Sequence, residues 1–365
     1  MANYSPAGTD QRQEKAFAAL CFAIVLPFAA LVLFEGSVAP GEFLKLAAAF
    51  IGIALLIAGA AFIPFAGVEL VKSGLRSGWK ERPALALWGA LKERWMADRF
   101  LSVGWPIALF LILLPSFNAF KQRILIHAGF RYDAELAQLD RTLFGTDPGM
   151  LLHKLIGSPW TTSFFDALYH SWFVPTTLGL CLVGLCASTR LRAQYMLSYV
   201  GVWLLLGAFA AYLVPAAGPA FYSVLVGPDG AAPFIAVHDQ LATSGQTRFL
   251  TSLGNQAYLL ENLGESKLVI GGGISAIPSV HNGMAVLFAL MSFRFHWTLG
   301  VVMSLFALLI WIASVYLNWH YAIDGLAGAV GAILIWHASG HIVERLAAII
   351  ETRSARAPAG PILAG

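Results

Sequence analysis

Eight stretches of the chain consist almost entirely of apolar residues and are long enough to constrain the whole fold. About 20 residues of α-helix cross the ~30 Å hydrocarbon core of a bilayer, and a helix satisfies its own backbone hydrogen bonds there. Hydrophobic residues make up 58% of the chain and charged residues only 12%, against roughly a quarter charged in a soluble domain. The sequence therefore predicts an all-α, polytopic membrane helix bundle. Its eight expected transmembrane spans are residues 16–34, 43–71, 100–117, 164–187, 195–214, 280–293, 297–317 and 321–341.

Two of these spans are unusual in length. The span at 280–293 is shorter than the others, so we expect its first turn to start at headgroup level, inside the protein. The first span, 16–34, is longer than the roughly 7 to 15 apolar residues of a signal peptide. We therefore expect it to be retained as a membrane helix.

Charge and cysteine content exclude some classes of function. The formal net charge is only +3 and the basic residues form no stripe, so we expect no nucleic-acid partner. Cys21, Cys181 and Cys186 all lie inside apolar stretches, where a thiol behaves as a small hydrophobic group. They predict neither a disulfide framework nor a metal site.

The distribution of Lys and Arg gives the expected orientation. The segment 72–99 holds seven basic residues, and we place it in the cytoplasm because short cytoplasmic loops are enriched in Lys and Arg. Alternation along the chain then puts both termini, and most of the 23 basic residues, on the cytoplasmic side. The two longest connections, 118–163 and 215–279, fall on the opposite side. Loops of this length are usually functional or disordered, and we expect them to form a cap over a site.

Three polar residues near the ends of the last three spans carry the expected chemistry. His281 follows Ser279 into the sixth span, and His320 precedes Asp324 by four residues where the eighth span begins. Residues four apart share one face of a helix, so the Asp324 carboxylate can accept the N–H of one ring nitrogen and leave the other free to attack. The alternative is a structural His–Asp pair inside the bundle. The second histidine at the same depth argues against it.

These segments resemble the second and third signature motifs of the type 2 phosphatidic acid phosphatase superfamily. The motifs are Pro-Ser-x-His, here ending at His281, and about forty residues later His-x-x-x-Asp, here His320 to Asp324. By this resemblance, His320 is the nucleophile that becomes phosphohistidine, Asp324 orients it, and His281 protonates the leaving group. The resemblance also implies a six-helix core, here preceded by two extra N-terminal helices.

Departures from the phosphatase pattern favour one branch of the superfamily. The phosphatases usually have Gly before the second-motif His and Arg six residues before the nucleophile, where this chain has Val280 and Ser314. Inositolphosphorylceramide synthases look closer. The resemblance to that branch implies transfer of a phosphoryl head group from a phosphatidylinositol-like lipid to a lipid alcohol such as ceramide. Further segments similar to that branch contain the expected substrate-cap residues Asp140, Tyr169, His170 and Tyr222.

The phosphate-binding residues are less clearly marked in the sequence. Lys121 and Arg123, just after the third span, are the candidates, with anchoring of the span at the interface as their alternative role. Ser279 joins them because the free N–H groups at a helix start bind phosphate. The run of three glycines at 271–273 is too plain for a phosphate loop, and we expect a flexible approach to the sixth span.

The superfamily's first motif, a Lys followed at a distance by Arg-Pro, has no clean counterpart. Lys80 with Arg82-Pro83 is too tightly spaced and lies on the cytoplasmic side in the expected orientation. We therefore expect it to stay out of reach of His320.

The chain is expected to have three parts: an N-terminal two-helix membrane segment with its cytoplasmic connector (1–99), a lipid phosphatase- or phosphotransferase-like membrane domain (100–345) and a cytoplasmic tail (346–365). Its expected partners are membrane phospholipid and lipid-alcohol substrates, with no cofactor or metal ion. The expected location is a bacterial inner membrane or its equivalent, with the site on the non-cytoplasmic face. Two alternatives stay open: a lipid phosphate phosphatase acting on a phosphatidate- or polyprenyl-phosphate-like substrate, and a non-enzymatic transporter or scaffold.

Overall fold

The computed structural model describes residues 7–35, 38–77, 97–265 and 267–356, and these residues form helices and no strand. Within those ranges, seven helical segments are long and apolar enough to cross a membrane. Each coincides with one of the expected spans, and the remaining span is the short helix α14 (Val280–Phe295). The predicted all-α membrane bundle is confirmed. The basic segment that set the expected orientation lies mostly outside the described residues, which exclude 78–96.

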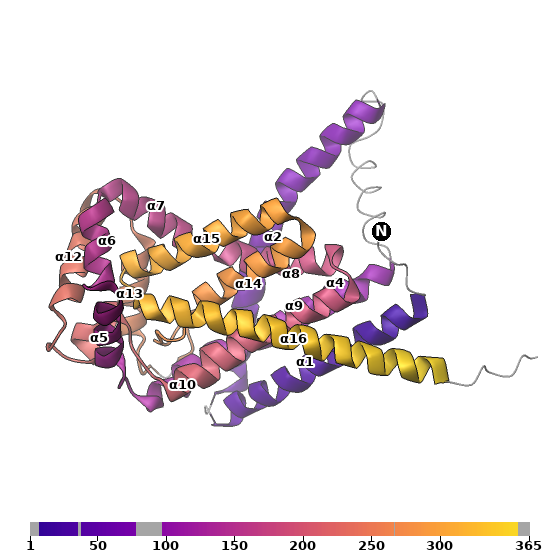
Figure 1. Ribbon diagram of the computed structural model, residues 1–365, viewed down its shortest axis with the longest axis horizontal. Helices are drawn as coiled ribbons and strands as arrows, with labels where there is room; N and C mark the ends of the chain where they lie inside the picture. Colours follow the sequence, from indigo (N-terminus) through magenta and orange to yellow (C-terminus); the bar gives the residue numbers. More distant parts are fainter. Residues whose placement is uncertain (1–6, 36–37, 78–96, 266, 357–365) are drawn as a thin grey trace, which may run out of the picture.

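The long helices of the bundle run roughly side by side along the horizontal direction of Figure 1. They are α1 (Ala7–Glu35), α4 (Ala97–Arg123), α9 (Thr189–Gly201), α14, α15 (Trp297–Tyr316) and α16 (Ala322–Arg356). The π-helix η2 (Val202–Ala210) and the short α10 (Ala211–Leu213) continue α9, and α7 (Pro159–His170) turns into α8 (Phe173–Cys186). The tightest pairing joins α14, α15 and α16, the three helices that carry the two signature motifs.

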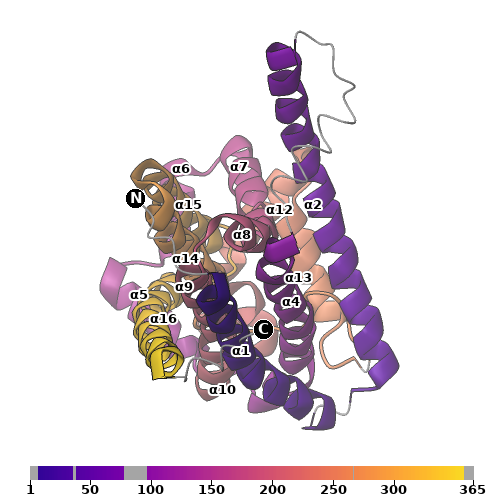
Figure 2. The ribbon, with the colours of Figure 1, turned by 90° about the vertical axis from the view of Figure 1, so that its right-hand side faces the viewer.

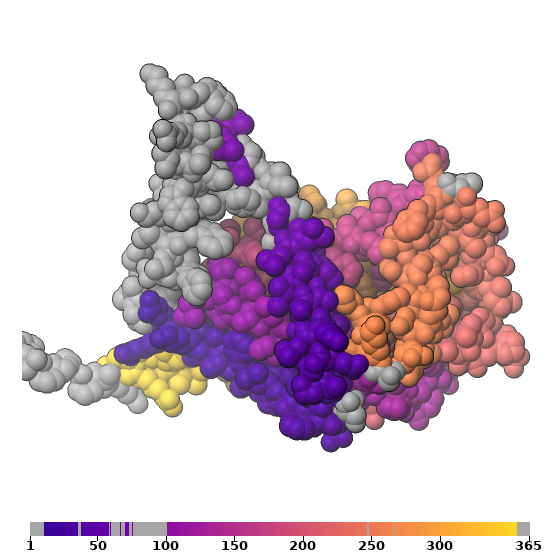
Figure 3. Space-filling view, turned by 180° about the vertical axis from the view of Figure 1, so that it is seen from behind, coloured from indigo at the N-terminus to yellow at the C-terminus, as the bar shows by residue number. Residues whose placement is uncertain are grey.

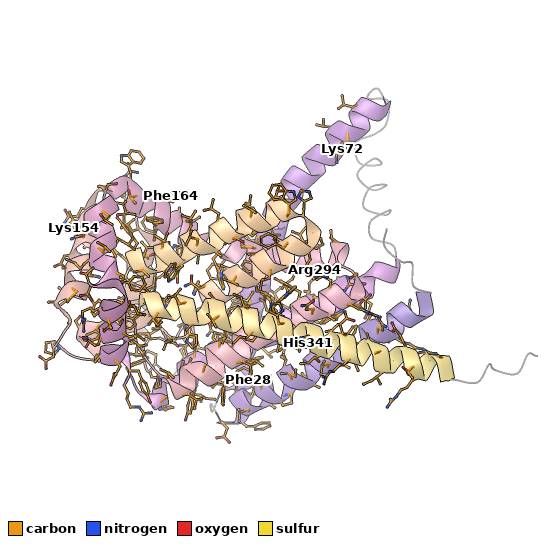
Figure 4. All side chains as sticks on the ribbon, viewed as in Figure 1. Phe28, Lys72, Lys154, Phe164, Arg294 and His341 are labelled. Atoms are coloured by element: carbon orange, nitrogen blue, oxygen red, sulfur yellow. The ribbon has the colours of Figure 1, made fainter. Side chains whose placement is uncertain are left out.

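The two long connections of the sequence contain short helices that gather at one end of the bundle, which we call the cap end. The first connection forms η1 (Leu125–Ala128), α5 (Asp133–Phe144) and α6 (Pro148–Ile156); the second forms η3 (Pro219–Phe221), α11 (Tyr222–Leu225), α12 (Ala232–Thr247) and α13 (Thr251–Glu261). Figure 4 places Lys154 and Phe164 at this end and Arg294 toward the opposite end.

At the end opposite the cap, α1 is joined to the bundle by a buried ion pair. The Glu14 carboxylate accepts hydrogen bonds from Nε and Nη2 of Arg192, both at 2.8 Å, and from the Trp105 indole at 2.5 Å. Nη1 of Arg192 also donates to the carbonyl oxygens of Gly184 and Ala187, which end α8. One pair of side chains therefore connects α1, α4, α8 and α9.

Helix α2 (Pro40–Ser77) packs on the outside of the bundle. It crosses the side of the bundle obliquely and its C-terminal part extends beyond it (Figure 2). Only 6% of its most apolar window is buried. Near its start, Glu42 lies 3.8 Å from Arg123 at the end of α4, and Leu46 and Phe50 are buried against the bundle. The contacts of α2 are therefore concentrated on α4 and α8.

Candidate active site

His320 and Asp324 lie together at the cap end, where the chain enters α16. Nδ1 of His320 is 3.4 Å from Oδ2 of Asp324, and the Asp324 side chain is fully buried. The same carboxylate oxygen accepts the backbone N–H of Tyr321 at 3.0 Å. Because a carboxylate accepts hydrogen bonds, it places the ring proton on Nδ1 and leaves the lone pair of Nε2 available.

Ser279 lies on the other side of the His320 ring. Its Oγ is 3.3 Å from Nε2 of His320, and it caps α14 by accepting the backbone N–H of Asn282 at 3.4 Å. The Asn282 side-chain amide donates to the same Oγ at 3.0 Å. With its oxygen accepting two hydrogen bonds, the hydroxyl can donate its own hydrogen to Nε2. The ring is thus held from both nitrogens.

Close contact between α14 and α16 brings the two motifs together. The backbone N–H of Ser279 donates to the Asp324 carbonyl at 3.0 Å. A Cβ on Gly328 would lie 2.3 Å from the Ser279 carbonyl oxygen, and one on Gly283 would lie 3.2 Å from the Gly328 carbonyl oxygen. Small residues let helix backbones approach closely in membrane bundles. Gly328 therefore sets the distance between Ser279 and Asp324.

The turn before His320 is fixed by backbone hydrogen bonds to the end of α15. The N–H groups of Trp319 and His320 donate to the Ser314 carbonyl at 2.9 and 3.2 Å. Asn318 has a positive φ of 64°, a conformation that Asn tolerates better than most residues. Its side-chain amide donates to the Phe234 carbonyl at the start of α12. These hydrogen bonds fix the backbone that places His320 in the cavity wall.

His281 lies beside His320 in an aromatic setting. The two imidazole centroids are 6.2 Å apart. The His281 ring stacks on Tyr169 at 5.0 Å and lies 4.4 Å from Trp172. The Trp172 indole donates to the His281 carbonyl at 3.1 Å. Tyr169 also stacks on Trp319, so a row of rings forms one wall of the site.

Both histidines open onto a cavity of about 400 Å³, within the range of ~300 to 1,000 Å³ typical of ligand sites. Most of its lining is apolar, and α2, α4, α8 and η2 supply the part of the lining that lies away from the histidines. The polar groups gather at the cap end, where they include Asn118, Lys121, His170, Asn255, Ser275, His281 and His320. This shape suits an amphiphile, with its polar end at the histidines and its apolar part among the helices.

The two predicted basic candidates for phosphate contact lie in different places. Lys121 lines the cavity together with His281 and His320. Arg123 is not part of that lining, and its guanidinium is directed to the Glu42 carboxylate at 3.8 Å. Of the pair, only Lys121 is brought to the histidines.

The triple glycine run is docked on the end of α4 beside Lys121. The Gly271 N–H donates to Oδ1 of Asn118 at 2.6 Å, and Oε1 of Gln122 accepts the Val269 N–H at 2.9 Å. Gly273 has a φ of 84°, and a Cβ there would lie 2.7 Å from the Lys121 backbone. The glycines therefore let the chain lie against α4 and form part of the cavity wall.

Among the predicted cap residues, Tyr169 and His170 line the cavity, whereas Asp140 and Tyr222 do not. Tyr222 packs on Phe234, with ring centroids 5.1 Å apart. Asp140 accepts the backbone N–H groups of Ala322 and Ile323, at 2.6 and 2.9 Å. It therefore caps α16 from a neighbouring helix. Burial raises the pKa of Asp140 to about 6, against the opposing effect of those two N–H groups.

Two further carboxylates hold the cap in the same way and were not predicted from the sequence. Asp133 accepts the N–H groups of Ala217 and Gly218, both at 2.8 Å, and the Tyr321 hydroxyl at 2.9 Å. Burial raises the pKa of Asp133. Asp166 accepts the N–H groups of Thr251 and Ser252, which start α13. The available signal was weak: Asp133 and Asp140 are seven apart and share one face of α5.

The residue ranges given above contain no group of three or more His, Cys, Asp or Glu side chains placed to hold a metal ion. A family model for the PAP2 superfamily matches residues 134–338, more than half of the chain. The matched region contains both histidines, Asp324, Ser279 and the cap helices from α5 to α13 apart from Asp133, and it begins after α4 and η1. The chain has no significant match among curated proteins or among solved structures.

Proposed function

Because the chain belongs to the PAP2 superfamily, we propose that it is an integral membrane phosphotransferase that uses His320 as a nucleophile. The donor is a phosphatidylinositol-like phospholipid, the acceptor is a lipid alcohol such as ceramide, and the intermediate is a phosphohistidine. Membership of the superfamily points to lipid phosphatase or phosphotransferase activity in general. The choice of phosphotransferase, donor and acceptor is our proposal.

One observation carries the proposal. Nε2 of His320, which carries no proton, meets Lys121 and a second histidine at the polar end of a largely apolar cavity. A nucleophile held by a third group is the arrangement of covalent catalysis. A phospholipid presents its phosphorus at the junction between a polar head group and apolar chains, which is where this cavity changes polarity.

In the first step, Nε2 of His320 attacks phosphorus as the bond from phosphorus to the diacylglycerol oxygen breaks. His281 gives a proton to that oxygen, so diacylglycerol leaves as a neutral alcohol. Asp324 stabilises the positive charge that develops on the His320 ring. The amino group of Lys121 and the N–H groups at the start of α14 stabilise the charge on the phosphoryl oxygens.

In the second step, the hydroxyl oxygen of the acceptor attacks phosphorus and the bond from phosphorus to Nε2 breaks. His281, neutral after the first step, takes the hydroxyl proton and is ready for the next cycle. The head group has then moved from one lipid to another with no net change in protons. Because Asp324 keeps the His320 proton on Nδ1, the same nitrogen is restored as the nucleophile.

We also propose that the site faces the non-cytoplasmic side and that both termini are cytoplasmic. Support comes from the basic residues of the sequence segment 72–99, and from Arg190 and Arg192 in the first turn of α9 and Arg294 in the last turn of α14, at the end opposite the cap. Short cytoplasmic loops are enriched in such residues. A bacterial inner membrane or its equivalent would provide this setting.

A lipid phosphatase is the second candidate, since water can replace the acceptor at the same three residues. Transfer is favoured by the two departures from the phosphatase pattern. Ser314, where the phosphatases have Arg, is fully buried, and its hydroxyl donates to the Trp311 carbonyl. A non-enzymatic transporter or scaffold would have no use for the alignment of His320 between Asp324 and Ser279.

The test is a transfer assay with purified protein and a phospholipid labelled in its head group, with and without ceramide. We expect label on ceramide, loss of that product in His320→Ala, and acid-labile phosphoryl label on the wild-type protein after brief mixing. Label released only to water would establish the phosphatase. No turnover and no covalent label with any phospholipid donor would refute both enzymatic functions.

A further inference from the structure

We infer that the apolar arm of the cavity is a fatty-acyl site whose outer wall is α2, so that helices outside the family-matched region select the chain length of the lipid. The inference names a binding site for a substrate tail and rests on the proposed function for its lipid. The arm extends from His281 and His320 to Phe50 and Ile53 on α2. Both α2 and α4 precede residue 134, where the family match begins.

One face of α4 forms the length of the arm. Its lining residues recur at helical spacing, which puts them in a single stripe: Phe110, Leu114, Phe117, Asn118 and Lys121. The stripe spans ~16 Å at 1.5 Å per residue, about half of the ~30 Å hydrocarbon core. It changes from polar at the histidines to apolar at Phe110. A phospholipid from one leaflet fits both the length and the polarity of this stripe, with its phosphate at Lys121 and one acyl chain directed toward Phe110.

The opposite wall keeps the arm open. From α8, Thr176 and Thr177 line it with short side chains, and Gly207 lines it from the π-helix η2. A Cβ on Gly207 would lie 2.7 Å from ring atoms of Phe117 and 2.7 Å from Val280. A side chain at position 207 would therefore displace Phe117 or Val280, two residues that line the arm next to the signature motif. π-Helices are rare and often mark functional sites.

Helix α2 closes the remaining side. Figure 3 shows α2 crossing this face of the molecule in front of α4, beside the segment that leads from α13 to α14. Phe50 is buried while Leu55 and Leu56, on the same helix, are exposed. Among the α2 side chains that the structure describes between 40 and 57, the buried ones Leu46 and Phe50 face the bundle, and Phe50 with Ile53 completes the arm. The contact between Glu42 and Arg123 holds its start against the end of α4.

Such an arm selects a chain by fit, because an acyl chain gains little by leaving lipid for an equally apolar cavity. A chain that matches the arm packs against its walls at protein density. A longer chain must bend or push the walls apart, and that overpacking is unfavourable. Changing the depth of the arm should therefore move the preferred chain length.

The experiment uses donors that share one head group and differ only in acyl-chain length. Leu114→Trp fills the arm midway and should lower the ratio of kcat/KM for long over short chains by about tenfold. Phe110→Ala deepens the arm and should shift the optimum to longer chains. Phe50→Trp tests the contribution of α2, and Leu56→Trp, at an exposed position on the same helix, is its matched control and should leave the profile unchanged.

A second measurement does not depend on turnover or on the larger substitutions folding. A phospholipid with a photoreactive group near the end of one acyl chain is bound to the wild-type protein and activated. Labelling of 110–117 on α4 and 50–53 on α2 supports the site, and labelling confined to exposed positions such as Leu55 and Leu56 refutes it.

Unchanged chain-length profiles in active Leu114→Trp and Phe50→Trp proteins would also refute the acyl site while leaving the proposed transferase intact. A wild-type protein without turnover would instead refute the proposed function, and the labelling pattern alone would then decide on the acyl site.

Discussion

Oγ of Ser279 lies 3.3 Å from Nε2 of His320, on the far side of the imidazole from Asp324. Ser279 belongs to the segment that resembles the second signature motif and His320 to the one that resembles the third, so this contact joins the two motifs at Nε2. The hydroxyl can donate to Nε2 only while no phosphorus is bound there. A phosphoryl group entering the site would take the place of that hydrogen bond and receive the Ser279 hydroxyl on one of its oxygens.

Replacing Asp324 by Asn should disable His320 while preserving its shape. An Asn amide N–H directed at Nδ1 favours the tautomer with its proton on Nε2, and that nitrogen then has no lone pair for the attack. The neutral amide also cannot stabilise a positively charged ring. In a His–Asp pair of this kind we expect a loss in kcat of about 10³- to 10⁴-fold. Transfer kinetics with the labelled donor measure the loss, and a correctly folded protein should still be recovered. Near-normal turnover in Asp324→Asn would exclude this role for the carboxylate.

The close contact between α14 and α16 predicts the effect of a single methyl group. In Gly328→Ala the new Cβ would start 2.3 Å from the Ser279 carbonyl oxygen, so the two helices must separate. Displacement of reacting groups by about 1 Å can cost ~10²-fold in rate, and we expect a loss of that order. Gly104→Ala on α4 is the control, because its Cβ would meet no atom within 4 Å. Equal activities for the two variants would contradict the packing argument.

The buried Asp140 predicts a pH-dependent part of the stability. Burial raises its pKa from 3.8 to about 6, so between those pH values the folded protein holds a proton that the unfolded chain has released. The stabilisation from that proton is complete below about pH 3.8 and is lost as the pH rises through about 6.

Asp140→Asn cannot titrate and isolates this contribution. The melting temperature of the wild type minus that of Asp140→Asn, measured in the same detergent, should fall from about pH 4 to about pH 6.5 and stay level above it. A difference that stays constant over the whole range would show that Asp140 titrates at its ordinary pKa.

The buried pair of Glu14 and Arg192 predicts that α1 is needed for stability. Glu14→Ala would leave the Arg192 guanidinium without its carboxylate, and breaking a buried pair in this way costs about 3 to 5 kcal/mol. Glu344 also faces an arginine, Arg190, but its side chain is 64% exposed. Glu344→Ala should therefore change the free energy of unfolding by no more than ~1 kcal/mol. Similar losses in the free energy of unfolding from both substitutions would show that the buried Glu14–Arg192 pair contributes no more than the exposed Glu344–Arg190 pair.

The features that the sequence predicted are those that depend on local spacing. Hydropathy places the long helices, because ~20 apolar residues are required to cross a bilayer whatever the surrounding fold. The predicted contact of His320 with Asp324 is present, but His320 lies in a bend before α16 begins at Ala322, so the two residues do not share one face of that helix as expected. The PAP2 resemblance rests on the same short motifs, and the family match confirms it at superfamily level.

The features that the sequence did not predict depend on partners far away in the chain. Nothing near Arg123 indicates that its partner is Glu42, on the preceding described helix. The cap is held by the carboxylates of Asp133, Asp140 and Asp166, which accept backbone N–H groups. The sequence pattern does not indicate which backbone N–H groups these carboxylates bind. The glycines at 271–273 were expected to be flexible, but Asn118 and Gln122 bind that segment. Hydrogen bonds between distant segments decide these details.

The two helices that start at the site differ in what covers their first turns. At α16 the leading N–H groups are occupied by anions of the protein itself, Asp140 and Asp324. At α14 the cap is the neutral hydroxyl of Ser279, bound to Asn282. A negatively charged ligand is therefore repelled at the start of α16 and can bind the free N–H groups at the start of α14. In the proposed reaction, this difference would direct the phosphate to the side of the His320 ring that carries the lone pair, so the protein's own acidic residues would orient an acidic substrate.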